Sequence, residues 1–356
     1  MNRRAFPAIA ILLILACHSD SFPGANYGAI GPRTPGAEIT IDSIGANPTW
    51  TDDGAGILYS GRCLTIHPPP SGTISAIDMQ PPVSGSVNWS RCESRQPMIA
   101  KPDSAERFPA ISLGSGARLL YVEAIGPNPS APIPCICTPF PLGWHAELWF
   151  ADTTGDAGPA PRKLQTLYHD HLGISPFNST QVDWLTDLHW VGTGDFLALG
   201  INLNVLGFMM PLGVYRGNTG GAPMQLVTGT FDASHYSLAE NGASIIFSHD
   251  SDSTTIRRVA VAGGTANVVA QIPAAPFRTI ADISCKGTFC LVTTNSPTGS
   301  IFYGLDLDSQ DVTELARDAR TFLRAQLSPT SSSVVLERSI GAGRPDAIFL
   351  DTGLIH

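Results

Sequence analysis

Pro48-Thr-Trp-Thr-Asp-Asp-Gly-Ala-Gly-Ile-Leu-Tyr59 combines a short segment ending in a bulky residue, a polar turn and an apolar segment. Degraded copies of this hairpin pattern recur along the rest of the chain. The positions equivalent to Trp50 are Ile111, Trp190, Tyr236, Ile283 and Leu327. The differences between successive residue numbers are 61, 79, 46, 47 and 44. The last three match the period of about 40–50 residues that is typical of a four-stranded propeller blade. The sequence therefore predicts an all-β fold, a single six-bladed β-propeller.

Each hairpin is followed by further apolar segments that complete a blade. The predicted blades cover approximately residues 48–92, 107–168, 186–228, 233–271, 279–316 and 323–351. The last blade has no room for a fourth strand, whereas Glu38-Ile-Thr-Ile-Asp42 precedes the first copy without a sheet of its own. We expect this N-terminal strand to join the C-terminal blade and close the ring, which leaves only short, protected edges. A seventh blade within residues 80–185 is the main alternative.

Composition agrees with one domain over residues 38–356. The chain has 35 glycines and 29 prolines, which disfavour long helices and suit many short strands joined by turns. Apolar residues make up 43% of the chain, enough for a substantial core. The formal net charge is −9, so no basic face for nucleic acid is expected.

The repeat resembles the WD40-like propeller repeats of the TolB family, in which a strand ending in Trp-Ser-Pro-Asp-Gly precedes an apolar strand. Trp50-Thr-Asp-Asp-Gly54 is the closest match, and Leu327-Ser-Pro-Thr330 and Leu238-Ala-Glu-Asn-Gly242 are weaker ones. The resemblance implies a propeller over residues 38–356 and is informative about the fold more than the function. TolB has an α/β domain before its propeller that this chain has no space for, so its translocation role is not transferred.

The N-terminus is typical of an exported lipoprotein. Residues 1–16 combine Arg3-Arg4 with the apolar run Ala8-Ile-Ala-Ile-Leu-Leu-Ile-Leu15, which is a secretory signal too short to span a bilayer. Ile14-Leu-Ala-Cys17 resembles the bacterial lipobox, which implies lipidation of Cys17; a plain secretory signal is the alternative. Residues 17–37 are rich in Gly and Pro and are expected to form a flexible tether. His18 follows the cysteine, which by resemblance favours the outer membrane, facing the periplasm, in a bacterial cell envelope.

Six cysteines remain, and an even number in an exported protein favours disulfides. They are Cys63, Cys92, Cys135, Cys137, Cys285 and Cys290. Cys285 and Cys290 flank a polar turn and are the most local candidate pair. Cys63 with Cys92 would join the ends of the first blade, and Cys135 and Cys137 lie in a Pro-rich insertion. No C-x-x-C zinc motif is present, and no cofactor is expected.

Polar residues expected at the mouth of the central channel are candidate ligand-binding or catalytic groups, and His189 and His235 among them fall on predicted innermost strands. The candidates are Asp187, His189, Asp232, His235 and Asp282. A hydrogen-bonded structural role is the simpler interpretation for the histidines. His169 and His171 flank Asp170 in an inter-blade connection and are a weak metal candidate.

The insertion between Ile125 and Trp149 carries aromatic residues on a Pro-rich loop and is a candidate binding lip. These residues are Phe140, Trp144 and Trp149.

Two functions fit the sequence. The first is a membrane-tethered scaffold that binds an envelope protein or polymer. The second is a hydrolase or lyase acting on carbohydrate or peptide at the mouth of the propeller channel. The common hydrolase, metalloprotease and nucleotide-binding motifs are absent, which favours the scaffold. Convergence of carboxylates and histidines with perturbed pKa values would favour the enzyme.

Overall fold

The structure is a computed structural model of the whole chain. It describes residues 38–42, 45–50, 57–61, 105–114, 118–126, 145–152, 162–167, 182–203, 209–275, 277–338, 347–351 and 354–355. Within these ranges the protein contains strands, turns and one 3-10 turn, η3 (Glu240–Gly242), with no α-helix. The all-β prediction is therefore confirmed. No described helix is both long and apolar enough to cross a bilayer.

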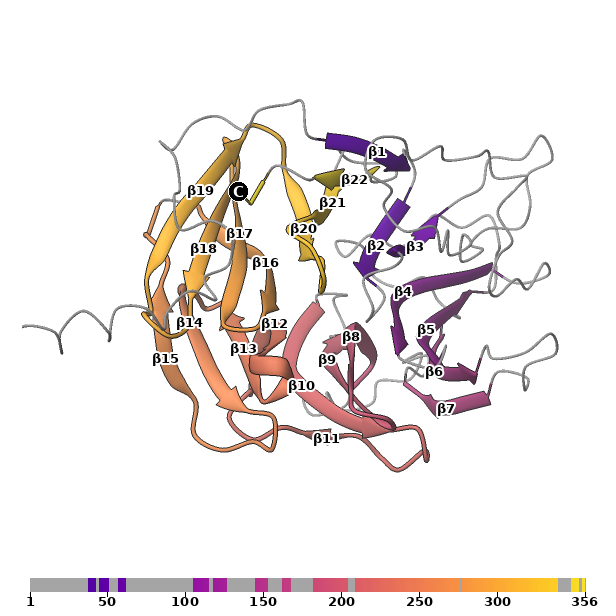
Figure 1. Cartoon of the computed structure of the whole chain (residues 1–356). Coiled ribbons are helices and arrows are strands. Elements are labelled where there is room, and N and C mark those ends of the chain that lie inside the picture. Colours follow the sequence, from indigo (N-terminus) through magenta and orange to yellow (C-terminus); the bar gives the residue numbers. More distant parts are fainter. Residues whose placement is uncertain are drawn as a thin grey trace, which may run out of the picture.

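The strands form antiparallel sheets that follow one another along the chain and surround a common centre (Figure 1). The first sheet pairs β2 (Gly45–Trp50) with β3 (Ile57–Gly61). The second contains β4 (Ala105–Gly114), β5 (Arg118–Gly126), β6 (His145–Asp152) and β7 (Arg162–Thr166). The third contains β8 (Trp184–Val191), β9 (Asp195–Leu203), β10 (Met209–Asn218) and β11 (Gln225–Leu226).

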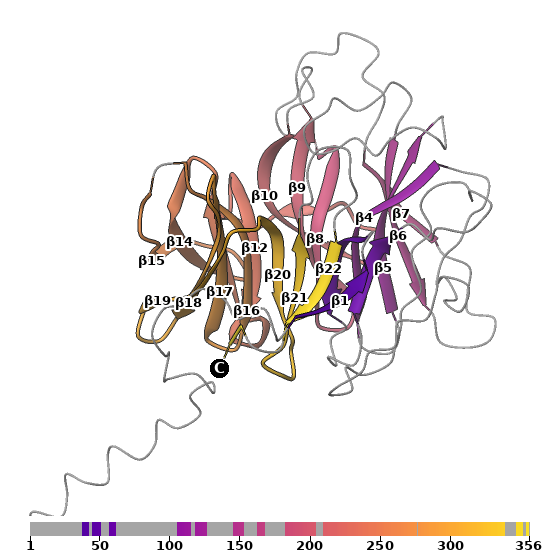
Figure 2. The same cartoon turned by 90° about the horizontal axis from the view of Figure 1, so that it is seen from above.

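The fourth sheet contains β12 (Ala233–Ala239), β13 (Ser244–His249), β14 (Asp252–Ala260) and β15 (Asn267–Gln271). The fifth contains β16 (Thr279–Lys286), β17 (Phe289–Ser296), β18 (Gly299–Asp306) and β19 (Val312–Asp318). Figure 2, turned by 90°, shows strands of successive sheets standing side by side. This is the arrangement of a β-propeller.

The sixth sheet combines the two ends of the described chain. It contains β20 (Phe322–Leu327), β21 (Val334–Arg338), β22 (Ala347–Asp351) and, at its outer edge, β1 (Glu38–Asp42). The antiparallel register sets Glu38 opposite Asp351 and Thr40 opposite Phe349. The N-terminal strand therefore lies in the C-terminal sheet, as the sequence predicts.

The hydrophobic core lies between the faces of successive sheets. One cluster joins the second and third sheets through Leu120, Leu148, Trp190 and Phe196. Further clusters join the third to the fourth sheet, the fourth to the fifth, and the fifth to the sixth. The third, fourth and fifth sheets are packed on both faces, so their central strands are apolar on both sides; Cys290, Leu291 and Val292 of β17 are all fully buried.

Polar side chains also connect neighbouring innermost strands. Ser237 Oγ of β12 accepts a hydrogen bond from the backbone N–H of Cys285 in β16 at 2.9 Å, and Ser284 Oγ of β16 accepts one from the N–H of Leu327 in β20 at 2.9 Å. Trp50 Nε1 donates to the carbonyl of Gln326 at 2.9 Å. An innermost strand is the edge of its sheet and would otherwise leave these backbone groups without partners.

These bonds also correct one detail of the predicted repeat. Ser237 and Ser284 occupy equivalent positions, so Leu327 corresponds to Cys285 and not to Ile283. The residue of β20 equivalent to Ile283 is Ala325, two positions earlier. The β16–β17 turn is much shorter than the β20–β21 turn. The sequence pattern assigned the repeat position by its distance from the turn, whereas the structural equivalence depends on the position in the strand.

Candidate functional site

Every innermost strand carries a β-bulge at the same place. The register between the first and second strand shifts between Ala46 and Thr49, Arg107 and Ala110, Thr186 and His189, Ala233 and His235, Ile280 and Asp282, and Phe322 and Arg324. A bulge bends its strand and redirects a side chain. The residues that follow the bulge are Thr49, Ala110, His189, His235, Asp282 and Arg324. Four successive sheets therefore place an ionisable side chain at one equivalent innermost position.

Asp187 lies within the bulge of β8 and has a left-handed backbone, with φ of 49°. This conformation is uncommon for a residue other than glycine and is maintained by its surroundings. The Asp187 carboxylate pairs with the guanidinium of Arg324, which comes from β20, three sheets further on. The Tyr236 hydroxyl of β12 donates to the Asp187 carbonyl at 2.5 Å. Asp187 therefore links three sheets.

Arg324 is the shared partner of the cluster. Its Nε lies 3.5 Å from Glu337 Oε2, and Glu337 is its cross-strand neighbour on β21. The side chains of Arg324, Asp187 and Glu337 are 20%, 14% and 4% exposed, so the ion pairs are largely removed from water. In such surroundings a charge is stable only with its partners present.

Asp282 is buried beside this ion pair and has a different acidity. Its Oδ2 accepts hydrogen bonds from the Ala325 N–H and from Gln326 Nε2, both at 2.8 Å. Burial, with a contribution from the negative charge of Asp187, raises the pKa of Asp282 to about 6, although Arg324 and the two hydrogen bonds oppose this shift. Burial acts in the same direction on Asp187, but the charge and hydrogen bond of Arg324 outweigh it and lower its pKa. The pKa of Asp282 is thus raised and that of Asp187 lowered.

The histidines of the cluster are held in the neutral form. Burial lowers the pKa of His189 and outweighs the attraction of Asp187, and its ring meets Tyr236 edge-on with centroids 5.2 Å apart. Burial also lowers the pKa of His235, outweighing Asp250, whose Oδ1 lies 3.8 Å from His235 Nε2. Neutral imidazoles offer one hydrogen-bond donor and one acceptor each.

The structure brings together four of the five predicted channel-mouth residues, namely Asp187, His189, His235 and Asp282. Asp232 lies elsewhere. It is exposed in the turn before β12 with φ of 58°, and its N–H bonds the Leu212 carbonyl at 3.3 Å. A turn position suits aspartate for local backbone reasons. Asp232 is therefore not part of this cluster, and its role at the mouth of the channel stays a prediction.

Other predicted residues have mixed outcomes. Cys285 and Cys290 form a disulfide across the β16–β17 hairpin. Trp149 lies within β6 and not on a loop; its ring stacks on Tyr121 and its Nε1 donates to Glu147 at 3.1 Å. The remaining candidates lie outside the described residues: Cys17, Cys63, Cys92, Cys135, Cys137, Phe140, Trp144, His169 and His171. In the described part of the chain, no three His, Cys, Asp or Glu side chains are placed to hold a metal ion.

Sequence reasoning missed Arg324, the residue on which the cluster depends. One signal could have found it. With Ala325 as the repeat position, Arg324 aligns with His189, His235 and Asp282, each of which comes directly before the bulky or apolar repeat residue.

The arrangement of sheets defines a β-propeller, and comparison with solved structures agrees. The chain is similar to an oligogalacturonate lyase in complex with manganese, with a TM-score of 0.51 and 9% identity over 87% of this chain and 77% of the lyase. It is also similar to a sialidase from Trypanosoma rangeli in complex with the inhibitor DANA, with a TM-score of 0.54, 10% identity and coverage of 87% of this chain and 55% of that longer one.

A protein described as a putative TolB from Agrobacterium tumefaciens has a TM-score of 0.47 and 11% identity over 73% of this chain and 81% of that one. The sequence matches no protein-family profile and no curated protein. At such low identity the similarities to the lyase and the sialidase establish a propeller-like fold and nothing about activity.

Proposed function

We propose that this chain is a six-bladed, membrane-tethered β-propeller that acts as a binding scaffold in the bacterial cell envelope. The pairing of β1 with β22 supports a closed ring, as do the contacts that β2 makes both with β4 and with β20, β21 and β22. One observation carries the functional part. The charged groups at the centre are occupied with one another, since Arg324 pairs with Asp187 and Glu337, and Asp282 accepts two bonds from β20. Such groups fasten sheets together, which suits a rigid binding platform.

The proposed address rests on the N-terminal sequence. Lipidation of Cys17 after the apolar run would anchor the protein, and residues 17–37 would tether the propeller near the membrane. The outer membrane facing the periplasm is the proposed location. The proposed partner is an envelope protein or polymer, without nucleic acid and without a cofactor.

Crosslinking in intact cells tests this function. The full-length protein and its Cys17→Ala variant are crosslinked, purified under denaturing conditions and analysed for covalent partners. We expect a discrete envelope partner that is captured by the anchored protein and much reduced with Cys17→Ala. Equal capture by both proteins, or no enriched partner, would overturn the tethered scaffold.

A second function is favoured by a specific observation. Asp282, with a pKa near 6, and Asp187, held ionised, have the opposed acidities that a general acid and its partner carboxylate need. The enzyme candidate is a hydrolase or lyase for carbohydrate or peptide, and two of the structurally similar proteins are a lyase and a sialidase.

The purified protein would be incubated with oligosaccharides and peptides, alongside Asp282→Asn. Turnover that is lost in Asp282→Asn while the fold is retained would establish the enzyme. No turnover of any of these substrates would eliminate this candidate.

A further inference from the structure

Two phenylalanines are exposed in equivalent connections of the propeller. Phe231 precedes β12 and is 63% exposed, and Phe277 precedes β16 and is 84% exposed. Each lies where the chain passes from the outer strand of one sheet to the innermost strand of the next. β12 and β16 are in contact, so both rings belong to the same face on neighbouring sheets. A single exposed apolar side chain is ordinary, but two large ones on the same face indicate an interaction site.

The backbone at Phe277 is strained, with φ of 57°. A bulky aromatic residue seldom adopts the left-handed region, and a conformation of this kind is a reason to look for a function. The Phe277 ring is largely exposed, so the strained backbone does not serve to pack this ring inside the protein. The strained backbone therefore holds the ring outward.

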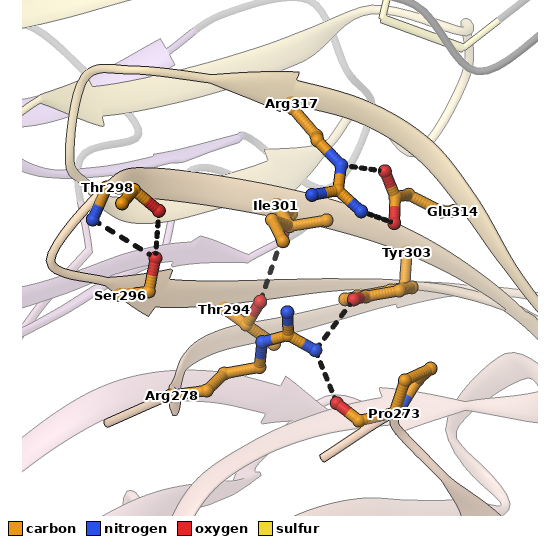
Figure 3. A network of polar contacts seen from close by, with 9 residues as sticks. All are labelled: Pro273, Arg278, Thr294, Ser296, Thr298, Ile301, Tyr303, Glu314 and Arg317. Atoms are coloured by element: carbon orange, nitrogen blue, oxygen red, sulfur yellow. Dashed lines mark hydrogen bonds and ion pairs between the residues drawn. The ribbon is translucent and has the colours of Figure 1, made fainter. Parts of the chain in front are cut away.

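The loop carrying Phe277 is anchored beside it. Arg278 Nη1 donates to the Pro273 carbonyl and, at 3.0 Å, to the Tyr303 hydroxyl of β18 (Figure 3). The Arg278 guanidinium also lies over the Tyr303 ring, 5.8 Å from its centroid. Figure 3 shows Arg278 joining the loop to the fifth sheet. Because these contacts hold the backbone next to Phe277, the loop loses little conformational freedom when a partner covers the ring, which favours binding.

Acidic groups accompany the phenylalanines on this face. Asp232 is exposed directly after Phe231, and the Asp250 carboxylate, 66% exposed, lies in the next turn of the same face near His235. Asp252 pairs with Arg257 at 3.2 Å. With His235 neutral, the three aspartates still exceed the two arginines, Arg257 and Arg278, so the face is apolar with a small excess of negative charge.

We infer that this face, defined by Phe231, Phe277, Asp232 and Asp250, binds an extended protein segment with a lysine or arginine next to an apolar side chain. The inference rests on the proposed scaffold function and specifies its partner. A cation complements Asp232 and Asp250 and also binds favourably over an exposed aromatic ring. The apolar side chain covers the phenylalanines. A neutral polysaccharide fits less well, because it brings no cation to balance the carboxylates of Asp232 and Asp250.

The test uses short fluorescein-labelled peptides and the purified mature protein. One peptide alternates lysine with leucine, a second replaces each lysine by glutamate, and a third replaces each leucine by serine. Fluorescence anisotropy gives the Kd for each. We expect the lysine–leucine peptide to bind at least about tenfold more tightly than either other peptide, with affinity falling as salt rises.

Three variants connect that binding to this face. Phe231→Ser with Phe277→Ser, and separately Asp232→Asn with Asp250→Asn, should each weaken it at least about tenfold. Phe277→Gly should weaken it without lowering Tm, since glycine accepts the left-handed backbone. Val268→Ser is the matched control, because Val268 is 51% exposed on β15, outside this face, and should leave binding unchanged.

Each outcome decides the inference. Equal binding of the lysine and glutamate peptides, competition by neutral oligosaccharides at the same residues, or no effect of the phenylalanine variants would overturn it. The scaffold function is judged separately. If membrane crosslinking captures a partner equally with Phe231→Ser and Phe277→Ser, the scaffold stands and this face is not its binding surface. If no partner is captured and no peptide binds, both fail.

Discussion

Replacing Asp282 by asparagine should make the protein more stable at neutral pH. Asparagine keeps the shape of the side chain, and its carbonyl oxygen can still accept the bonds from Ala325 and Gln326, now at 2.8 Å. What is lost is the negative charge, which burial and Asp187 disfavour. Asp282 is only 6% exposed, so water does little to reduce this penalty.

The magnitude follows from the change in acidity. The pKa of Asp282 rises from the model-compound value of 3.8 to about 6 in the folded protein. Each unit corresponds to about 1.4 kcal/mol, so ionisation of Asp282 disfavours the fold by about 3 kcal/mol. Between pH 4 and 6 the folded state binds more protons than the unfolded state. This carboxyl therefore makes stability fall as pH rises through that window, and its effect vanishes below about pH 4.

Urea unfolding of both proteins from pH 4 to pH 8 measures this difference. We expect the two stabilities to be similar near pH 4 and Asp282→Asn to exceed the wild type by about 3 kcal/mol near pH 8. Asp308→Asn, at an exposed turn carboxyl, is the control and should show no such divergence. A difference between Asp282→Asn and the wild type that does not change with pH would refute the reasoning.

Other substitutions test the remaining contacts. Arg324→Met should lower the free energy of unfolding by about 2–4 kcal/mol, because it leaves buried carboxylates without their cation. Adding Asp187→Asn should recover part of this loss, as measured by urea unfolding. If the losses of the two single variants simply add in the double variant, the ion pair is contradicted. Phe277→Gly should raise stability by about 1 kcal/mol, because glycine relieves the left-handed strain, and a lower Tm would contradict it. Cys285→Ala should lower the free energy of unfolding by about 2 kcal/mol, because the disulfide to Cys290, five residues away, no longer restricts the unfolded chain. Unfolding of the variant and of the wild type with and without reductant measures this loss.

The fold was largely predictable because hairpin geometry leaves a periodic pattern in the sequence. A bulky residue, a polar turn and an apolar run must recur in each blade, so Trp50, Trp190 and Tyr236 indicate their strands even though the copies differ. The place of Glu38–Asp42 beside β22 followed from counting strands. The sheet register did not follow, because turns differ in length and moved the apparent repeat position of β20 from Ala325 to Leu327.

The centre was predictable only in part. His189, His235 and Asp282 are recognisable as polar residues in apolar strands. The ion pair of Asp187 with Arg324 joins the third sheet to the sixth, and such a contact leaves no local signal in a single sequence. Phe231 and Phe277 were not anticipated for a related reason, since a phenylalanine beside a turn is ordinarily expected to be buried.

The pairing of β1 with β22 has a consequence for how the chain is made. Glu38 meets Asp351, so the sixth sheet is incomplete until nearly the whole described chain has been synthesised. Contacts of such long sequence separation form late and slow folding, and until they form the edge of β22 is open to other chains. For the export that we propose, that delay would be useful, because an unfinished propeller stays unfolded enough to pass a secretion channel. It also makes the product sensitive to truncation at either end, since loss of a few residues from β1 or β22 removes the last pairing step.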